Sequence, residues 1–264
     1  MHILPVSVGL GLFLATAPVA IGQTVEPLEV RGLGSGTYTR DGKLHLPAGA
    51  SGKVPAVLFT PGTDGVDQRF DYHRPGLLKA GIAVFEIDTK TGIFTGERDR
   101  PKNEFFEPIA FGALKALQSH PRIDAARIGV MGWSAGATTS ISVGHRHVAN
   151  HYLKSDEPRF AAHVGMYGGC SMSRGLLLTG APVLVLQGKL DTHVRYERCV
   201  TFKQSFSNVA FFLYPDIHHG FDKEGINRTT GGRTMRWNKE AAEDARARVL
   251  AFFVEVLKPR SLSE

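Results

Sequence analysis

Cysteine is scarce in this sequence, with only Cys170 and Cys199 among 264 residues. Neither belongs to a C-x-x-C pair, which excludes the redox and zinc-binding motifs built on that spacing. Two interpretations stay open, because separation along the chain does not establish proximity. The cysteines are either two buried thiols or, in an oxidising compartment, the halves of a disulfide.

Charge is absent from the first 25 residues, which contain no Asp, Glu, Lys or Arg. Residues 3–20 are apolar with many small side chains, and the A-I-G sequence that ends at residue 22 is typical of a cleavage site. We therefore predict a signal peptide over 1–22, export to the periplasm or beyond, and a single domain over 23–264. The prolines and glycines of the segment disfavour a permanent membrane helix, so no stable span is expected after processing. An uncleaved anchor is the alternative.

Blocks of like charge, internal repeats and low-complexity segments are also missing. Lys and Arg number 31 against 25 Asp and Glu, a net charge of +6, but the basic residues are scattered. A nucleic-acid partner is therefore not expected. No linker-like stretch divides the chain, which favours one domain. Composition and charge do not predict its oligomeric state.

Short apolar runs that end in glycine or proline alternate with helical patterns along the rest of the chain. Most runs are apolar on both faces, which is typical of parallel strands covered by helices on both sides. We predict an α/β fold in three layers, with a mostly parallel sheet of about eight strands and helices on both faces. Strands are expected at 25–32, 37–47, 54–62, 82–88, 126–132, 160–169, 181–189 and 209–216, and helices at 69–80, 101–119, after residue 134 and at 240–257.

A Gly-x-Ser-x-Gly motif, G-W-S-A-G, follows the apolar run at 126–132 and makes Ser134 a candidate nucleophile. Ligands of open parallel sheets bind beyond the carboxyl ends of the strands. Asp191 follows a later run there and His219 the last one, so the chain order is Ser, Asp, His, as in α/β-hydrolase triads. Imidazole can accept the serine proton, and a carboxylate can orient the imidazole. Asp216 and His218 are the rival acid and base.

The serine mechanism also needs donors for the oxyanion that forms on the substrate. The backbone N–H of Ala135 is free to donate because it opens a helix. The second donor is expected in the loop after 54–60, at the N–H of Thr63, with Asp64 as the alternative. The flanking glycines are expected to let the Ser134 hydroxyl protrude without steric conflict.

These motifs, together with G-K-L-D-T-H-V, H-G-F at 219–221 and the long final helix, resemble the dienelactone hydrolase family of α/β hydrolases over about 54–257. The resemblance implies the α/β-hydrolase fold, with Ser134 as nucleophile, Asp191 as acid and His219 as base. Members that open dienelactones have a cysteine nucleophile, and a glutamate where this chain has Gly62. Those two departures favour a serine esterase of the family.

Other side chains are candidates for binding roles. Trp133, Tyr167 and Phe221 flank motif positions and are candidates for the substrate pocket, with burial in the core as the alternative. A metal site at His145, His147 and His151 is not favoured, because no carboxylate accompanies them in a metalloprotease-type pattern. Arg98 and Arg100, in a polar loop at 89–101, are more simply solvated charges than a carboxylate-binding pair.

The function predicted from these observations is an exported serine hydrolase that cleaves small-molecule carboxylic esters or lactones through an acyl-enzyme. No metal or organic cofactor is expected. Two alternatives stay open: a small serine peptidase of the same fold, and a catalytically silent binding protein.

Overall fold

The computed structural model describes residues 23–33, 39–87, 106–170 and 177–257. The predicted signal peptide lies outside these residues, as do Arg98 and Arg100 with the whole of their loop at 89–101. Within the described residues, no helix is both long and apolar enough to cross a membrane.

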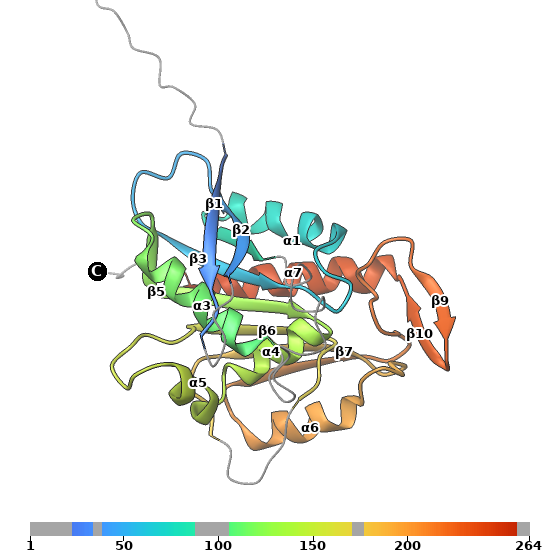
Figure 1. The fold of residues 1–264 in the computed structure, drawn as a ribbon. Helices are drawn as coiled ribbons and strands as arrows, with labels where there is room; N and C mark the ends of the chain where they lie inside the picture. The colour runs from blue at the N-terminus through green and yellow to red at the C-terminus, as the bar shows by residue number, and fades with distance from the viewer. Residues whose placement is uncertain (1–22, 34–38, 88–105, 171–176, 258–264) are drawn as a thin grey trace, which may run out of the picture.

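An eight-stranded sheet forms the centre of the molecule (Figure 1), in the order β1-β2-β4-β3-β5-β6-β7-β8. Strand β2 runs antiparallel to both β1 and β4, and all other neighbours are parallel. The prediction of a mostly parallel sheet of about eight strands is confirmed. The strands are β1 Thr24–Arg31, β2 Thr39–Leu46, β3 Val54–Thr60, β4 Ala83–Ile87, β5 Ile123–Trp133, β6 Ala162–Met166, β7 Val183–Gly188 and β8 Val209–Tyr214.

Helices cover the sheet on both faces, which makes the three predicted layers. Helices α1 and α7 contact each other on one face, and α3, α4 and α6 cover the other. The helices are α1 Gln68–Lys79, α3 Glu107–Ser119, α4 Ala135–Ser142, α5 Arg146–Tyr152, α6 Tyr196–Ser205 and α7 Lys239–Leu257.

The burial of the strands explains their sequences. Every residue of β4, β6 and β7 is buried, because these strands lie between two helical layers. Most of their side chains are therefore apolar on both faces of the sheet. Strand β1 lies at the edge, and most of its residues are exposed or half-buried. The apolar runs therefore mark the central strands, whose carboxyl ends carry the candidate site.

Two elements were not predicted. Helix α6 has too few apolar residues to give a strong helical pattern. A hairpin of β9 (Asn227–Thr230) and β10 (Arg233–Arg236) lies between β8 and α7, where the sequence predicted no element. Its two turn residues, Gly231 and Gly232, have φ of 57° and 75°, which suits the tight turn of a hairpin.

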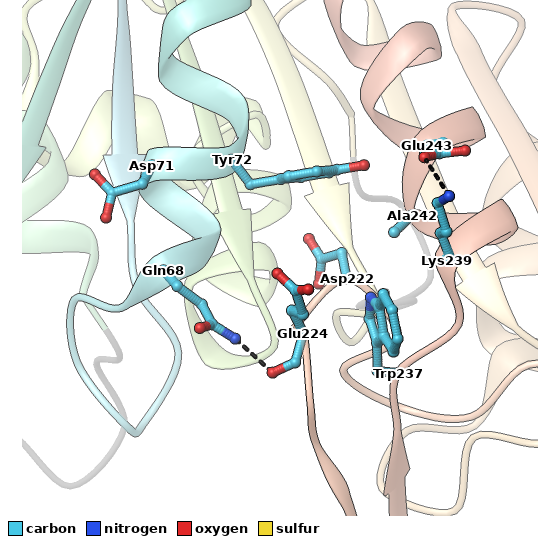
Figure 2. A pocket seen from close by; sticks show the side chains of 9 residues that line it. All are labelled: Gln68, Asp71, Tyr72, Asp222, Glu224, Trp237, Lys239, Ala242 and Glu243. Carbon is cyan, nitrogen blue, oxygen red and sulfur yellow. Dashed lines mark hydrogen bonds and ion pairs between the residues drawn. The ribbon is translucent and has the colours of Figure 1, made fainter.

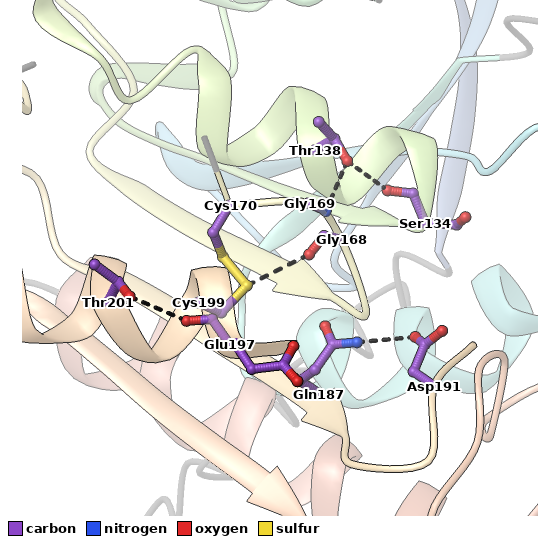
Figure 3. Close-up of a disulfide and its surroundings, with 10 residues drawn as sticks. All are labelled: Ser134, Thr138, Gly168, Gly169, Cys170, Gln187, Asp191, Glu197, Cys199 and Thr201. Atoms are coloured by element: carbon purple, nitrogen blue, oxygen red, sulfur yellow. Dashed lines mark hydrogen bonds between the residues drawn. A yellow bond between two sulfur atoms is a disulfide. The ribbon is translucent and has the colours of Figure 1, made fainter. Parts of the chain in front are cut away.

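A disulfide joins Cys170, which follows β6, to Cys199 in α6 (Figure 3). Of the two interpretations open from the sequence, the structure has the disulfide. Both residues are buried, and Cys199 packs beside Phe202 in a small apolar cluster under β7 and β8. The disulfide therefore links the segment after β6, close to the candidate site, to α6, which lies on the same face of the sheet as α3 and α4.

Candidate active site

Ser134 lies on a sharp turn between β5 and α4. Its φ is 54° and its ψ is −112°, a backbone conformation that residues other than glycine rarely adopt. The turn is held from both sides. The Ser134 N–H donates to the carbonyl oxygen of Met166 at 3.0 Å, and the N–H of Thr138 donates to the Ser134 carbonyl oxygen at 3.0 Å.

The two glycines of the motif are required by close backbone contacts. A Cβ on Gly132 would lie 2.2 Å from the carbonyl group of Gly136, and a Cβ on Gly136 would lie 2.1 Å from the Thr60 carbonyl oxygen. These distances are too short for any side chain. The glycines thus let α4 begin directly against the end of β3, a different reason from the protruding hydroxyl expected from the sequence.

Ser134, His219 and Asp191 form a continuous chain of hydrogen bonds. The His219 Nε2 atom lies 3.0 Å from the Ser134 Oγ, and the His219 Nδ1 atom lies 2.7 Å from the Asp191 Oδ2. The three residues follow β5, β8 and β7, so the parallel strands bring them to one edge of the sheet. The side chains of His219 and Asp191 are almost entirely buried.

Other donors fix the Asp191 carboxylate. Its Oδ1 atom accepts the backbone N–H groups of His193 and Val194 at 2.7 and 3.0 Å, and its Oδ2 atom accepts the Gln187 side-chain N–H at 2.8 Å. The rival acid, Asp216, is exposed. The rival base, His218, is engaged by the Leu190 carbonyl oxygen at 3.0 Å.

A cavity of about 90 Å³ opens beside the Ser134 hydroxyl. Thr63, one predicted oxyanion donor, lines it, and Ala135, the other, opens α4 next to Ser134. Arg69 and Arg228 bring positive charge to this small space, and Asp64 brings negative charge. The lining residues are Gly62, Thr63, Asp64, Arg69, Ser134, His193, His219, Arg228 and Met235.

The three candidate pocket residues, Trp133, Tyr167 and Phe221, do not line this cavity. All three are fully buried. The indole N–H of Trp133 and the hydroxyl of Tyr167 both donate inward, to Asp222, with the indole bond at 2.7 Å. The Tyr167 ring also contacts the ring of His219, edge to face, with 4.7 Å between centroids. These aromatic side chains therefore support the site from the core side.

Asp222 is the centre of a buried polar network that was not predicted. Its carboxylate also pairs with His73, at 3.4 Å between the His73 Nε2 and Asp222 Oδ2 atoms. Burial alone would raise the pKa of Asp222. Hydrogen bonds from His73 and Tyr167, with the charges of His73 and Arg69, lower it below its usual range instead. The network thus favours a charged carboxylate inside the core.

Arg69 connects this network to the cavity. Its guanidinium group donates to Tyr167 Oη at 3.0 Å and to both carboxylate oxygens of Asp67 at 2.7 Å. Burial alone would lower the pKa of Arg69, but Tyr167, Asp67 and Asp222 raise it. The same guanidinium lies at the cavity wall, so a fixed positive charge faces the space next to Ser134.

Sequence reasoning missed Arg69, Asp222 and His193, although each is close to a motif that it used. Asp222 directly follows the H-G-F tripeptide, His193 lies two residues after Asp191, and Arg69 follows the loop that contains Thr63. Their proximity to these motifs indicates that they lie near the site, but no sequence pattern predicts which side chains they contact.

Two larger cavities lie outside the triad. One of about 400 Å³ lies between α1 and the start of α7, with Tyr72 and Trp237 on its sides and Asp222 at its wall (Figure 2). The other, of about 450 Å³, lies beyond His193 and is lined also by Cys170, Arg195 and Arg198. Of the three triad residues, none lines either cavity.

The first histidine of the sequence H-R-H-V-A-N-H, His145, is buried, and its Nδ1–H donates to the Ser142 carbonyl oxygen at 3.2 Å. Across the described parts of the chain, no group of three or more His, Cys, Asp or Glu side chains is arranged to hold a metal ion.

The sequence pattern that describes the dienelactone hydrolase family matches residues 41–257. Two curated relatives match in sequence. A bis(hydroxyethyl) terephthalate hydrolase of Streptomyces coelicolor is 33% identical over 125 residues, which are 45% of this chain and 36% of the relative. Esterase FrsA of Yersinia enterocolitica is 31% identical over 133 residues, which are 49% of this chain and 29% of the relative. Each match thus spans about a third of the relative's length.

Solved structures share the fold at low sequence identity. A dienelactone hydrolase-like promiscuous phosphotriesterase from metagenomic libraries superposes with a TM-score of 0.66 at 18% identity, over 89% of this chain and 99% of that one. An esterase of Pyrobaculum calidifontis gives a TM-score of 0.62 at 16% identity, over 88% of this chain and 85% of that one.

Proposed function

The chain belongs to the dienelactone hydrolase family, and from this premise we propose that it is an exported serine hydrolase that cleaves carboxylic esters or lactones. The two curated relatives are named as an ester hydrolase and an esterase, which supports the reaction class. One observation carries the proposal: the unbroken hydrogen-bond chain from Asp191 through His219 to Ser134.

Acylation begins when His219 Nε2 takes the hydroxyl proton of Ser134 as Oγ attacks the ester carbonyl carbon. His219 becomes an imidazolium, and the Asp191 carboxylate stabilises it through the Nδ1–H. Charge develops on the carbonyl oxygen of the substrate, where the N–H groups of Thr63 and Ala135 donate to it. One such donor is worth about 3–4 kcal/mol of barrier.

Collapse of the tetrahedral intermediate breaks the ester bond. His219 returns its proton to the leaving alkoxide, so the alcohol departs neutral and an acyl group remains on Ser134. Water then enters, loses a proton to His219 and attacks the acyl carbon. As the second intermediate collapses, the bond between the acyl carbon and Ser134 Oγ breaks and His219 gives its proton to Oγ, which releases the carboxylic acid and restores the Ser134 hydroxyl.

The cavity beside Ser134 supports a preference for short acyl chains, because it measures only about 90 Å³. The arginines at its wall favour oxygen-rich substrate groups over long alkyl chains. Export is supported by the charge-free N-terminal segment and by the Cys170–Cys199 disulfide, since disulfides persist mainly in oxidising compartments.

A fluorophosphonate probe tests the nucleophile. Labelling is expected in the wild type and in Ser205→Ala, a change of the same type on exposed α6, and is expected to be absent in Ser134→Ala. Folded wild-type protein that stays unlabelled would favour the silent binding protein.

Substrate class is tested with p-nitrophenyl esters of increasing acyl length, beside lactones, bis(hydroxyethyl) terephthalate and a dipeptide amide. Acetate and butyrate esters are expected to give the highest kcat/KM. Faster cleavage of long-chain esters would contradict the small acyl site, and faster cleavage of the amide would favour the peptidase.

The signal peptide is tested on secreted material by N-terminal sequencing. We expect the mature chain to begin at Gln23. A chain that still begins at Met1 would count against cleavage.

A further inference from the structure

Among the described residues, two rings contact the imidazole of His219. One is Tyr167, described above. The other is His193, whose ring stacks almost parallel on His219, with 4.3 Å between centroids and 17° between planes. His193 also lines the cavity beside Ser134, so it lies next to both the base and the expected substrate position.

The backbone of His193 is separately engaged. Its N–H donates to Asp191 Oδ1 at 2.7 Å, and the neighbouring Thr192 hydroxyl accepts the N–H of Thr234 in the hairpin at 2.9 Å. A substitution of His193 therefore keeps the backbone hydrogen bond to Asp191 and removes only the ring. The effect of the stacked ring on His219 can thus be measured while the backbone N–H still holds the Asp191 carboxylate.

The surroundings of His193 favour its neutral form. Its Nε2 atom is buried without a hydrogen-bond partner among the described residues. Burial lowers the pKa of His193, the positive charge of His219, Arg233 and Arg228 lowers it further, and Asp191 opposes them. The other charged groups that line the two cavities beside His193 are Asp64, Arg69, Arg195 and Arg198.

We propose that His193 is a positioning residue for the catalytic base: its neutral ring stacks on His219 and holds that imidazole between Ser134 and Asp191. This inference rests on the proposed hydrolase function. During acylation His219 becomes a cation, and the face of a neutral aromatic ring stabilises a nearby cation. A positive charge in the same place opposes the imidazolium, because like charges repel at this distance.

Four variants separate these effects: His193→Phe, His193→Ala, His193→Gln and His193→Arg. The Phe variant keeps a flat neutral ring and should retain kcat within about threefold. The Ala and Gln variants lose the stacked ring, and kcat should fall about three- to tenfold with KM nearly unchanged, from the usual strength of an aromatic pair. The Arg variant places a permanent charge there, and its kcat should fall by more than tenfold.

The pH profile of kcat/KM provides the readout that a purely structural role would not move. The acid limb of the Arg variant should lie at least about half a pH unit below that of the Phe variant, because the added charge makes protonation of the base harder. Coincident acid limbs would overturn the proposal. So would an Ala variant as fast as the wild type, or a Phe variant as slow as Ala.

A second measurement needs no turnover. Nuclear magnetic resonance of the His193 ring protons should show His193 binding its proton at a higher pH in His219→Gln than in the wild type, because the facing charge is gone. An unchanged titration would refute the coupling of the two rings. If no substrate is hydrolysed but this coupling is present, the proposed function fails and the ring contact stands.

Discussion

Replacement of Asp222 by alanine removes the centre of the buried network under the candidate site. Asp222 is almost completely buried, and its carboxylate accepts the indole N–H of Trp133 at 2.7 Å and the Tyr167 hydroxyl. It also pairs with His73. Alanine leaves the Trp133 and Tyr167 donors without this acceptor inside the core, so the loss of stability should be large.

The magnitude follows from the donors that lose their acceptor. Each buried donor left without an acceptor costs about 1–3 kcal/mol, and the indole N–H of Trp133 and the Tyr167 hydroxyl both lose Asp222. We therefore expect Asp222→Ala to lower the free energy of unfolding by about 4 kcal/mol. Asp222→Asn should lose less, about 2 kcal/mol, because its amide oxygen still accepts from Trp133.

Urea unfolding at pH 7, followed by circular dichroism with the disulfide intact, measures the loss. With a slope near 3 kcal/mol per molar urea, Asp222→Ala should lower the midpoint by more than about 1 M. The matched control is Asp244→Ala. Asp244 also accepts a tyrosine hydroxyl, that of Tyr214 at 2.6 Å, but lies near the surface beside Arg248. The control should lose less than about 1 kcal/mol. Equal losses in Asp222→Ala and Asp244→Ala would refute the reasoning.

Three further predictions concern other parts of the fold. Gly136→Ala should cost at least about 2 kcal/mol, because its Cβ would lie 2.1 Å from the Thr60 carbonyl oxygen; an unchanged thermal midpoint would contradict this. Burial lowers the pKa of His163 from 6.5 to about 4. The neutral ring therefore contributes fully to the free energy of unfolding above pH 6.5, and that free energy should fall by about 3 kcal/mol as the pH drops toward 4. In His163→Asn, the free energy of unfolding measured in urea should change less between pH 6.5 and pH 4 than in the wild type. An equally steep fall in the variant would show that His163 does not cause the loss. The double variant Cys170→Ser/Cys199→Ser should lose about 3 kcal/mol of stability in calorimetry, whereas a loss below 1 kcal/mol would show that the crosslink contributes little.

The sheet and the positions of the triad could be predicted for the same physical reason. Strands buried between two layers are mostly apolar on both faces, so β4, β6 and β7 stand out as apolar runs with a single polar residue in each. Because parallel strands end at one edge, residues that follow different runs must lie near one another. Ser134, Asp191 and His219 each follow such a run, and the structure brings their side chains within hydrogen-bond distance.

The buried network could not be predicted in this way. Asp222 and Trp133 are 89 residues apart in the chain, and Arg69 and Tyr167 are 98 apart. No period of two or 3.6 residues relates such pairs, and a single charged residue in a loop looks like any solvated one. The hairpin differs, because the sequence T-T-G-G-R-T at 229–234 has the two-glycine turn between β-forming residues that indicates a hairpin.

The two buried carboxylates of the site act on different parts of it. Asp191 contacts the proposed base, His219, at its Nδ1 atom. Asp222 lies three residues after His219 in the chain and accepts from Trp133, the residue before Ser134. That bond fixes the loop of the base relative to the nucleophile turn, independently of the bond between the two reactive side chains. Because Tyr167 joins the same carboxylate and contacts His219, the alignment of base and nucleophile depends on the core beneath them, where a buried charge is hard to replace.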